Sequence, residues 1–389
     1  MVKISERIQT AIVGCGGIVN ARIMGYRTIW EKGFKYFDLV AMCDLAEERA
    51  QQRASEAEAF QGVKPKVYTD FKTMLEKEPG LELIDIATDH RSHHTIAVPC
   101  LEAGKHVIIA KPLGISMRAC KVMVDAAREN NRLLAVAENA RRSPAERAIN
   151  WVVKSGRIGQ PRMLFWHEIA ERLGTWAWRD FKEEAGGGWV LDGGVHFADL
   201  FRYHLGDAKQ VYAVSKQFEP VRYHNPQTKE GKVDVTVEDT TIAVITFEND
   251  VILQWSDCRV AREKQYNMRA LYGSEGCIDW REGWQHQGEI VPMNKLIEEF
   301  MSCLSDDERE QLFPAGITHT FALEIKELGD ALLHDESFEV DGMVGLKAEA
   351  IPIGIYESSW LGKAVSISDI ENCEIENYQR DINEGVGLS

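Results

Sequence analysis

The chain has 389 residues, of which 44% are hydrophobic and 27% charged, as in an ordinary folded protein with two or three domains. Its formal net charge of −16 argues against nucleic acid or a membrane surface as the main partner, because both require a basic face, and leaves small molecules as the expected ligands. Eight cysteines without paired spacing and the absence of long apolar runs predict a cytoplasmic protein with neither a disulfide framework nor a metal site.

Short apolar runs alternate with longer amphipathic ones in the first part of the chain. The apolar runs predict strands at Thr10–Val13, Leu39–Cys43, Leu83–Ala87, His106–Ile109 and Leu133–Val136. Strict alternation of strands with helices implies right-handed crossovers and a parallel sheet covered on both faces. We therefore expect an α/β, doubly wound domain over residues 1–142.

The pattern changes after Ser143-Pro144 and a helix that runs through Val153. Longer strands with period-two alternation predict two hairpins, Thr240–Phe247 with Val251–Ser256 and Met268–Tyr272 with Cys277–Trp280. Residues 143–389 are therefore expected to form a second domain with a mainly antiparallel sheet.

Other parts of this second domain carry weaker signals. Residues 219–238 and 281–316 are polar or irregular and are expected to form loops. Residues 343–361 predict a closing helix, despite Pro352 and Gly354, which can pack back on the first domain.

A glycine-rich turn, Gly14-Cys15-Gly16-Gly17-Ile18-Val19, follows the first predicted strand and opens a helix. Backbone N–H groups and the helix dipole hold a pyrophosphate in this context, so Gly14, Gly16, Gly17 and Ile18 are candidate cofactor-binding residues. Val19 stands where the dinucleotide fingerprint has Gly or Ala, which loosens the packing of helix on strand. An ordinary strand-to-helix turn is the alternative interpretation.

Asp44 ends the second predicted strand. A carboxylate there can accept both hydrogen bonds of an adenosine ribose and would repel a 2′-phosphate, so NAD is favoured over NADP. Helix capping is the alternative role of Asp44, and the nearby Arg49 keeps NADP as a lesser option.

Lys111 lies between a predicted strand and Pro112, which holds it in an extended conformation at the carboxyl end of the sheet. Ligands bind at that edge of open parallel sheets, so Lys111 is a candidate contact of cofactor and substrate, with solvated surface as the alternative. Thr88 and His93 follow another strand and are expected at the rim of the same pocket.

Residues 186–200 place a carboxylate and an imidazole behind a run of glycines. Asp192 and His196 lie one helical turn apart, and the carboxylate can fix the tautomer of the imidazole and support its protonated form. Gly193 and Gly194 would each cost about 1 kcal/mol relative to alanine in a helix, so we expect a planar ligand to approach the backbone there. A structural histidine is the alternative, and Asp199 is expected to be a structural partner.

Four tryptophans lie close to this segment in the sequence: Trp166, Trp176, Trp178 and Trp189. An aromatic cleft suits the apolar face of a sugar ring or an aglycone, and Trp176 is a candidate substrate contact. Core packing explains the tryptophans equally well.

These motifs together resemble the glucose-fructose oxidoreductase and inositol dehydrogenase (Gfo/Idh/MocA) family from about Ile8 to Val365. The matching elements are Gly14–Gly17, Glu102–Val107, Lys111-Pro112, Ser155–Gly159, Trp178-Arg179, Gly186–Gly188, and Asp192, His196 and Asp199. The resemblance implies an N-terminal Rossmann domain, a C-terminal α/β domain whose open sheet mediates dimers or tetramers, and reversible hydride transfer.

The resemblance also implies roles for individual residues. Lys111, Asp192 and His196 match the positions that handle the substrate hydroxyl, with the histidine as acid or base. Arg179 and Asn139 would then contact substrate or cofactor. Ala110 departs from the family, because the Glu-Lys-Pro motif has glutamate there, which puts nicotinamide orientation or cofactor affinity in question.

The sequence thus predicts an NAD-dependent dehydrogenase that oxidises a secondary hydroxyl of a pyranose sugar, a glycoside or a cyclitol, with C3 of a glucoside as the candidate position. Redox-neutral alternatives are NAD-dependent glycoside cleavage and an intramolecular oxidoreduction with a tightly held cofactor. A third alternative is a nucleotide-sensing binding protein that has lost catalysis. A homodimer, a homotetramer or a higher homo-oligomer is expected.

Overall fold

The computed structural model describes residues 6–388, so the expected domain limits at residues 1 and 389 lie outside the described part. The chain forms two compact units and passes between them several times. The first unit consists of Met1–Gly114, Ala119–Ser143 and Asp306–Gly345. The second consists of Ile115–Arg118, Pro144–Ser305 and Leu346–Ser389. The sequence-based boundary near residue 143 therefore coincides with one of these passages.

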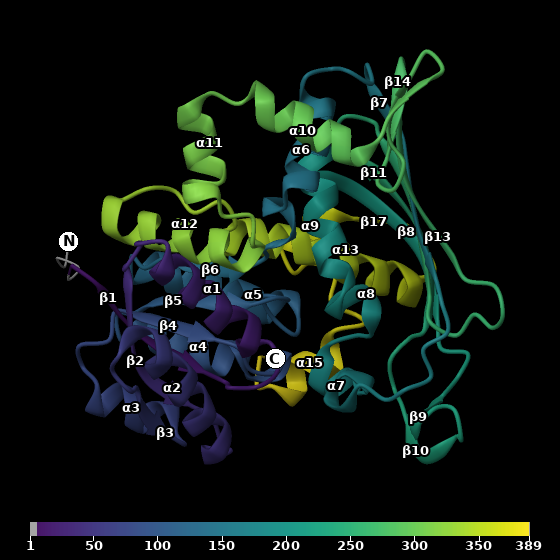
Figure 1. Cartoon of the computed structure of the whole chain (residues 1–389). Helices are drawn as coiled ribbons and strands as arrows, with labels where there is room; N and C mark the ends of the chain where they lie inside the picture. The colour runs from purple at the N-terminus through teal and green to yellow at the C-terminus, as the bar shows by residue number, and fades with distance from the viewer. Residues whose placement is uncertain (1–5, 389) are drawn as a thin grey trace. The chain divides into compact units, whose positions relative to one another are not determined.

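A six-stranded parallel sheet forms the centre of the first unit (Figure 1). Its order is β3-β2-β1-β4-β5-β6, with β1 at Ile8–Val13, β2 at Phe37–Cys43, β3 at Lys66–Tyr68, β4 at Leu83–Ile86, β5 at His106–Ala110 and β6 at Leu134–Ala137. All five expected strands are present, and the doubly wound prediction is confirmed. The three-residue β3 is missing from the prediction because so short a run shows no periodicity.

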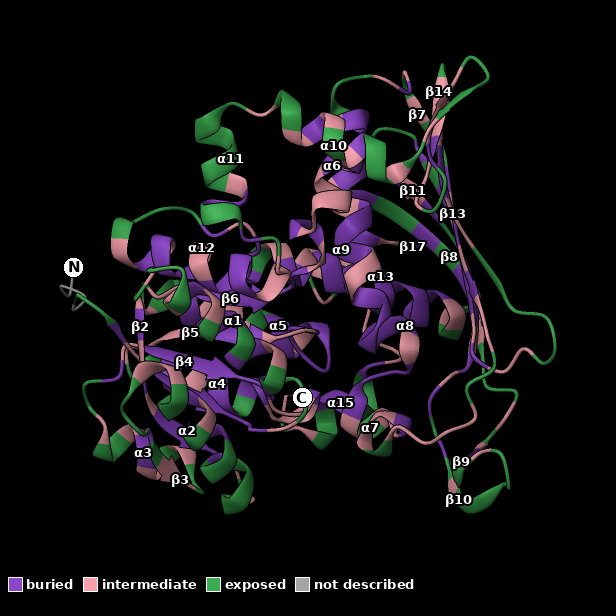
Figure 2. Cartoon of the chain, viewed as in Figure 1, coloured by how far each residue is buried: buried purple, intermediate pink, exposed green. Residues whose placement is uncertain are grey.

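Helices cover this sheet, and its strands are among the most buried parts of the chain (Figure 2). The helices of the first unit are α1 (Val19–Glu31), α2 (Glu47–Gln61), α3 (Phe71–Lys77), η1 (His90–Ser92), α4 (His93–Glu102), α5 (Met117–Glu129), η2 (Ala140–Arg142), α11 (Asp306–Leu312), η4 (Pro314–Gly316) and α12 (Thr320–His334); α11 lies away from the sheet (Figure 1). Every residue of β4 is buried, as in parallel strands covered on both faces.

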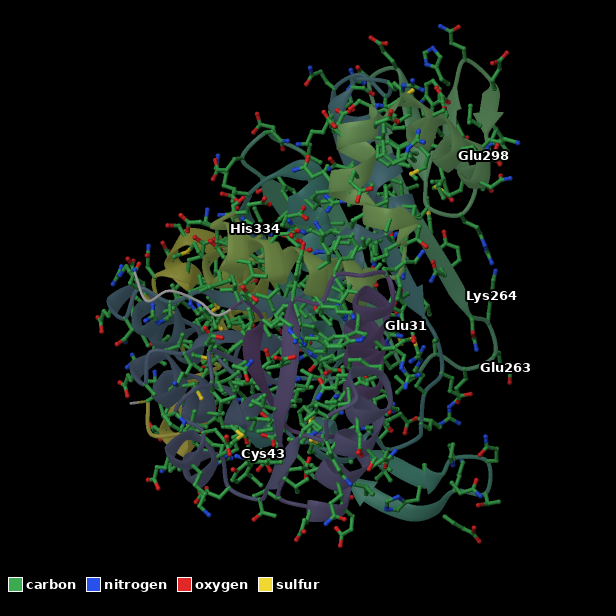
Figure 3. The ribbon with its side chains drawn as sticks, turned by 60° about the vertical axis from the view of Figure 1, so that its left-hand side comes forward. Glu31, Cys43, Glu263, Lys264, Glu298 and His334 are labelled. Atoms are coloured by element: carbon green, nitrogen blue, oxygen red, sulfur yellow. The ribbon has the colours of Figure 1, made fainter. Side chains whose placement is uncertain are left out.

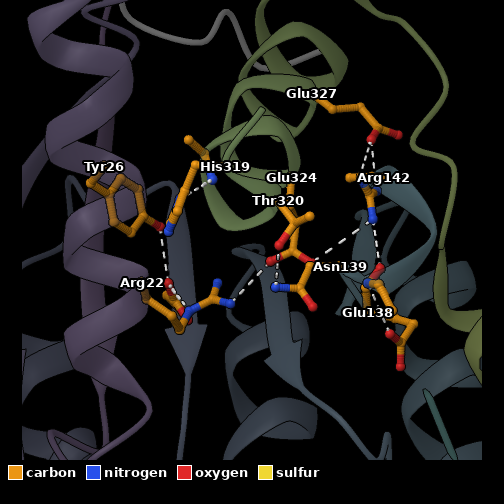
Figure 4. A network of polar contacts seen from close by, with 12 residues as sticks. Arg22, Tyr26, Glu138, Asn139, Arg142, His319, Thr320, Glu324 and Glu327 are labelled. Carbon is orange, nitrogen blue, oxygen red and sulfur yellow. Dashed lines mark hydrogen bonds and ion pairs between the residues drawn. The ribbon is translucent and has the colours of Figure 1, made fainter. Parts of the chain in front are cut away.

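Helix α12 belongs to the first unit, although the sequence analysis placed its residues in the second domain. It packs closely on α1, where a Cβ on Gly25 would lie only 2.7 Å from the side chain of Ile325. Buried charges also join the two helices, because Arg22 of α1 donates to Glu324 of α12 at 3.2 Å (Figure 4). The sequence of a helix shows its apolar face but does not show which of the two units the helix packs against.

A nine-stranded sheet forms the second unit (Figure 1). Its order is β16-β15-β14-β13-β7-β12-β11-β8-β17, with β7 at Pro161–Ile169, β8 at Ala208–Lys216, β11 at Thr240–Phe247, β12 at Ile252–Cys258, β13 at Tyr266–Gly273, β14 at Gly276–Asp279, β15 at Gly283–His286, β16 at Glu289–Val291 and β17 at Val365–Ser366. Only β7 and β12 pair in parallel. Both expected hairpins, β11 with β12 and β13 with β14, are confirmed.

Helices α6, α9 and α13 lie on one face of this sheet (Figure 1). The helices of the second unit are α6 (Pro144–Lys154), η3 (Ala177–Asp180), α7 (Lys182–Ala185), α8 (Trp189–Asp192), α9 (Gly194–Leu205), α10 (Met293–Cys303), α13 (Gly342–Leu361), α14 (Ile367–Glu371) and α15 (Arg380–Gly385). The first residues of α13 belong to the first unit. The expected closing helix is confirmed, with Pro352 inside it.

The predicted loops at residues 219–238 and 281–316 are wrong. The first contains a two-stranded ribbon, β9 (Val221–Asn225) with β10 (Glu230–Asp234), and the second contains β15, β16, α10 and α11. The strands β9, β10, β15 and β16 and helix α11 bury few residues and show no clear apolar period. Helix α10 is amphipathic, so its prediction as a loop misread the pattern: it buries Leu296 and Phe300, and Glu298 is exposed on it (Figure 3).

No helix within residues 6–388 has the length and apolar character that a membrane span requires. The same residues contain no group of three His, Cys, Asp or Glu side chains arranged to hold a metal ion.

Candidate active site

The glycine-rich turn after β1 has the shape that a bound dinucleotide needs. Gly14 has φ +86°, and a Cβ there would lie 2.6 Å from the carbonyl oxygen of Ala87, so only glycine fits. A Cβ on Gly16 or Gly17 would meet nothing within 4 Å. The exposed Ile18 precedes α1 and provides no side-chain cap, so the N-terminus of α1 and its dipole face an open approach. These residues therefore fit a pyrophosphate group.

Asp44 follows β2 and joins the glycine-rich turn to the start of α2. Its Oδ2 accepts a hydrogen bond from the N–H of Cys15 at 2.7 Å, and its Oδ1 accepts one from the N–H of Ala46 at 2.8 Å. Each carboxylate oxygen has a further lone pair available for a ribose hydroxyl. The structural and cofactor-binding roles of Asp44 are thus compatible, and the second stays a prediction.

Arg53 supports the same turn and was not identified from the sequence. This buried side chain of α2 directs its guanidinium to the carbonyl oxygens of Cys15 and Gly16, both at 3.4 Å. Glu56 pairs with it at 2.8 Å. No motif distinguishes this arginine from the other charged residues of α2, so only the fold reveals its contact with the turn.

His93 opens α4 and contacts the loop that follows Lys111. Its side chain has 0% exposure, and Nδ1 lies 3.0 Å from the carbonyl oxygen of Pro112 and 3.2 Å from that of Leu113. Burial lowers the pKa of His93 to about 4, so the neutral ring donates through Nδ1–H. His93 therefore fixes the backbone beside Lys111, and its direct contact with cofactor stays a prediction.

Lys111, Thr88 and Asn139 all follow strands of the parallel sheet at their carboxyl ends. Lys111 comes directly after β5 and is joined to Pro112 by a cis peptide bond. Thr88 follows β4, where its methyl group would lie 2.9 Å from a Cβ on Gly14. Asn139, which follows β6, is buried and donates from Nδ2 to Oγ1 of Thr320 at 3.1 Å. The first unit thus gathers these candidates at its ligand-binding edge.

The glycines before His196 fit tryptophans of the chain itself, which corrects the expectation of a planar ligand at this backbone. A Cβ on Gly193 would lie 2.5 Å from the indole of Trp189, and one on Gly194 would lie 2.7 Å from the indole of Trp255. Helix α8 ends at Asp192, and α9 begins at Gly194. The glycines therefore permit close packing of indole rings inside the second unit.

Asp192 forms an ion pair with Arg179. Its Oδ1 accepts from Nε of Arg179 at 3.1 Å, and the guanidinium of Arg179 lies 4.2 Å from the ring centroid of Trp178. Two of the predicted substrate-binding residues are thus brought together. The orientation of the His196 imidazole by Asp192 stays a prediction.

The four tryptophans divide into two groups. Trp166 is fully buried and packs against Phe197 and Phe201, with ring centroids 4.9 and 5.0 Å apart, so it belongs to the core. Trp176 lies 5.0 Å from Trp189, and both line a narrow pocket that Arg179 also borders. The expectation of an aromatic site therefore rests on Trp176 and Trp189.

Comparison with known proteins identifies both units. Residues 8–138 match an oxidoreductase family with an NAD-binding Rossmann fold, and residues 147–279 match the GFO/IDH/MocA C-terminal domain. The chain is 30% identical over 257 residues to the trans-1,2-dihydrobenzene-1,2-diol dehydrogenase of Oryctolagus cuniculus. The aligned region covers 65% of this chain and 70% of that protein.

Two bacterial relatives are also similar. The levoglucosan dehydrogenase of Pseudarthrobacter phenanthrenivorans is 30% identical over 229 residues, covering 54% of this chain and 57% of the relative. The D-glucoside 3-dehydrogenase of Escherichia coli is 26% identical over 254 residues, covering 64% and 69%. The chain spans between 53% and 57% of the length of several curated relatives that it matches.

A solved structure shows the same fold over most of the chain. The oxidoreductase domain protein from Kribbella flavida superposes with a TM-score of 0.76 at 22% identity, covering 93% of this chain and 100% of that one. The chain belongs to the GFO/IDH/MocA oxidoreductase family, and its first unit is the NAD-binding Rossmann domain of that family.

Proposed function

We propose that the protein is an NAD-dependent dehydrogenase that oxidises a secondary hydroxyl of a pyranose sugar, a glycoside or a cyclitol to a ketone. The observation that carries the proposal is the open glycine-rich turn beside Asp44, in a chain whose second unit pairs Arg179 with Asp192 close to His196 in sequence. The relatives that act on sugars and diols support this class of reaction.

The proposed chemistry divides the work between the cofactor and the chain. When bound, NAD supplies the hydride acceptor at C4 of its nicotinamide. His196 accepts the proton of the substrate hydroxyl, and Lys111 stabilises the alkoxide that develops on the same oxygen. Asp192 orients the imidazole, and the lysine is the second candidate for the proton transfer.

The proposed cofactor is NAD rather than NADP. Asp44 places a carboxylate at the end of β2, where it would accept ribose hydroxyls and repel a 2′-phosphate. Arg53, the buried arginine closest to this turn, is occupied by Glu56 and by backbone carbonyl oxygens. The finer proposal for the substrate is C3 of a glucoside, which the indoles of Trp176 and Trp189 and the similarity to the D-glucoside 3-dehydrogenase support.

The test is an assay of the purified protein with NAD or NADP and a panel of glucose, methyl glucosides and myo-inositol. We expect reduced nicotinamide to accumulate with NAD and a glucoside, as followed by its absorbance. Sugar release from a glycoside without accumulation of NADH would instead identify the redox-neutral alternatives. Binding of NAD without turnover of any sugar would identify a nucleotide-sensing protein.

A further inference from the structure

The second unit contains a narrow pocket in which arginines and indoles predominate. Its cavity volume of about 20 Å³ holds little more than one water-sized group. The side chains that matter for its charge and shape are Arg172, Arg179, Arg222, Arg259, Trp176 and Trp189. A sugar and a charged substituent on it can therefore lie only at the mouth of this pocket.

Three of the four arginines have partners within the protein. Arg179 pairs with Asp192 at 3.1 Å, and Arg259 pairs with Glu168 at 2.7 Å and with Asp257. Arg222 donates to the carbonyl oxygen of Glu219 at 2.9 Å, and its guanidinium lies 4.0 Å from Asp239. Their charges are therefore offset before any ligand arrives.

Arg172 differs from the other three. Its guanidinium lies 5.4 Å from the ring centroid of Trp189 and 5.9 Å from that of Trp176, and within residues 6–388 it forms no ion pair with a carboxylate. Arg259 lies 4.1 Å from the same Trp189 ring, so one indole carries two cations. Arg172 is exposed, so an anion at the mouth of the pocket can reach it and offset its charge.

Two acidic side chains also border the pocket, and both accept hydrogen bonds from neighbouring groups of the protein. Asp180 accepts from the N–H of Trp176 at 2.7 Å. Glu238 accepts from the N–H of Gly188 at 2.7 Å and from the hydroxyl of Tyr356 at 2.8 Å. Burial raises the pKa of Glu238, which lowers its tendency to carry a negative charge. Both acids therefore stabilise the residues that line the pocket, and Arg172 can bind a ligand.

We propose that the substrate carries a terminal oxyanion, a carboxylate or a phosphate, that Arg172 binds at the mouth of this pocket. The inference rests on the proposed sugar oxidation, because it names the chemical class of that substrate. Arg179 links the two, since it borders the pocket and holds Asp192, the proposed positioning group for the reacting hydroxyl's base. The planar fork of an arginine matches both oxyanions, and the indoles fix its orientation.

Calorimetric titration of the protein with NADH bound tests this proposal without turnover. The probes are D-glucuronate, D-glucose 6-phosphate and neutral D-glucose. We expect at least one of the two anionic sugars to bind about ten- to a hundred-fold more tightly than glucose, the gain of one charged hydrogen-bonded pair. The preferred anion distinguishes a carboxylate from a phosphate substrate.

Three variants locate the effect. Arg172→Gln should abolish the preference for the anion, and Arg172→Lys should keep part of it, because the charge remains while the fork is lost. Arg162→Gln, at an exposed arginine of β7, should leave the preference unchanged. Equal affinity for charged and neutral sugars, no binding of either anion, or an unchanged preference in Arg172→Gln would overturn the proposal. NADH production from neutral glucosides would leave the dehydrogenase function standing in that case.

Discussion

At the scale of single residues, Gly194 permits close packing of the segment that carries His196. The indole of Trp255 occupies the space that a Cβ would need, and the ring is fixed in the core. Gly194→Ala should therefore lower the free energy of unfolding by about 1–3 kcal/mol, as measured by urea denaturation. Gly80→Ala is the matched control, because a Cβ there meets nothing within 4 Å, and it should change stability by less than about 0.5 kcal/mol. Equal stabilities of the two variants would contradict the packing argument.

His196 is the residue on which the proposed chemistry depends most. His196→Ala should reduce kcat by about two to four powers of ten, because proton removal from the hydroxyl would lose its base. NAD affinity, measured by titration, should stay unchanged. His224→Ala, at an exposed histidine of β9, is the control and should keep full turnover. A His196→Ala enzyme with the kcat of the control would refute the assignment.

Several site residues were predictable from spacing alone, and others were not. Gly14 and Asp44 follow the first two strands in a pattern that backbone geometry imposes, so the sequence indicates them. Arg53 acts on the backbone of a turn that is remote in sequence, and such a contact leaves no local pattern. His93 was named from its place after a strand, but its contact with the backbone that follows Lys111 was not predicted. The partners of Gly193 and Gly194 were misread because a glycine shows that something approaches closely but does not say whether it is ligand or side chain.

At the scale of elements, α12 is joined to the parallel sheet by a network of buried charges (Figure 4). Arg22 of α1 pairs with Asp85 of β4 at 2.8 Å and with Glu324 of α12 at 3.2 Å. Arg142 of η2 lies 3.9 Å from Glu324 and pairs with Glu327 at 2.6 Å. Removal of one partner from such a network leaves an uncompensated buried charge, so the network specifies where α12 docks.

This network should make stability depend on pH. Burial raises the pKa of Glu324 from 4.5 to about 7. Between those values the folded state holds a proton that the unfolded chain has lost, so stability falls as pH rises, by at most about 1.4 kcal/mol per pH unit. Glu324→Gln has no titrating carboxyl at this position and therefore does not lose this stability. The free energy of unfolding of the variant minus that of wild type, measured by urea denaturation, should rise from pH 4.5 to 7 and then level off.

The comparison of Glu324→Gln with wild type isolates one carboxyl. Burial also raises the pKa of Asp257 to about 7, but that group is common to both proteins and its effect cancels in the difference. Glu58→Gln, on the exposed side of α2, should follow the wild-type profile throughout. A constant difference between Glu324→Gln and wild type over this range would contradict the prediction.

Element prediction succeeded where burial is strongest. The strands of the Rossmann sheet are covered on both faces and read as apolar runs, so all but the short β3 were predicted. The ribbon of β9 and β10 and the helix α11 bury few side chains, and their periodicity is too weak to predict them. Helix α10 is amphipathic and was misread as part of a loop. Helix propensity does not predict where α12 docks either, because the charged partners of α12 lie far away in the sequence.

At the scale of the whole molecule, the nine-stranded sheet exposes an apolar patch. Ile242 lies opposite Val214, and Val244 opposite Tyr212, on the neighbouring strands β11 and β8. Each of these four side chains is between 43% and 54% exposed. A contiguous exposed patch of this kind marks an interaction surface, and we propose that it joins copies of this chain in a homo-oligomer.

The patch gives a direct test of the assembly. Ile242→Glu should shift the protein to a smaller species in size-exclusion chromatography with light scattering, because the interface would have to bury an unpaired charge. Val63→Glu is the control, since Val63 is an exposed apolar residue of the first unit and lies outside the patch. An unchanged mass for Ile242→Glu, or an equal shift in the control, would exclude this surface as the interface.

The return of α12 to the first unit has a consequence for biosynthesis. When Arg142 is added to the nascent chain, Glu324 is still 182 residues from being translated, counted from their positions in the sequence. At ordinary translation rates that interval lasts about 10–40 s. During it the nascent Rossmann half carries Arg22 and Asp85 without the acidic helix that completes their surroundings. The folding of the first unit is therefore completed late in translation or after it. A fragment that ends at residue 143 would lack α12, as the nascent chain does during this interval.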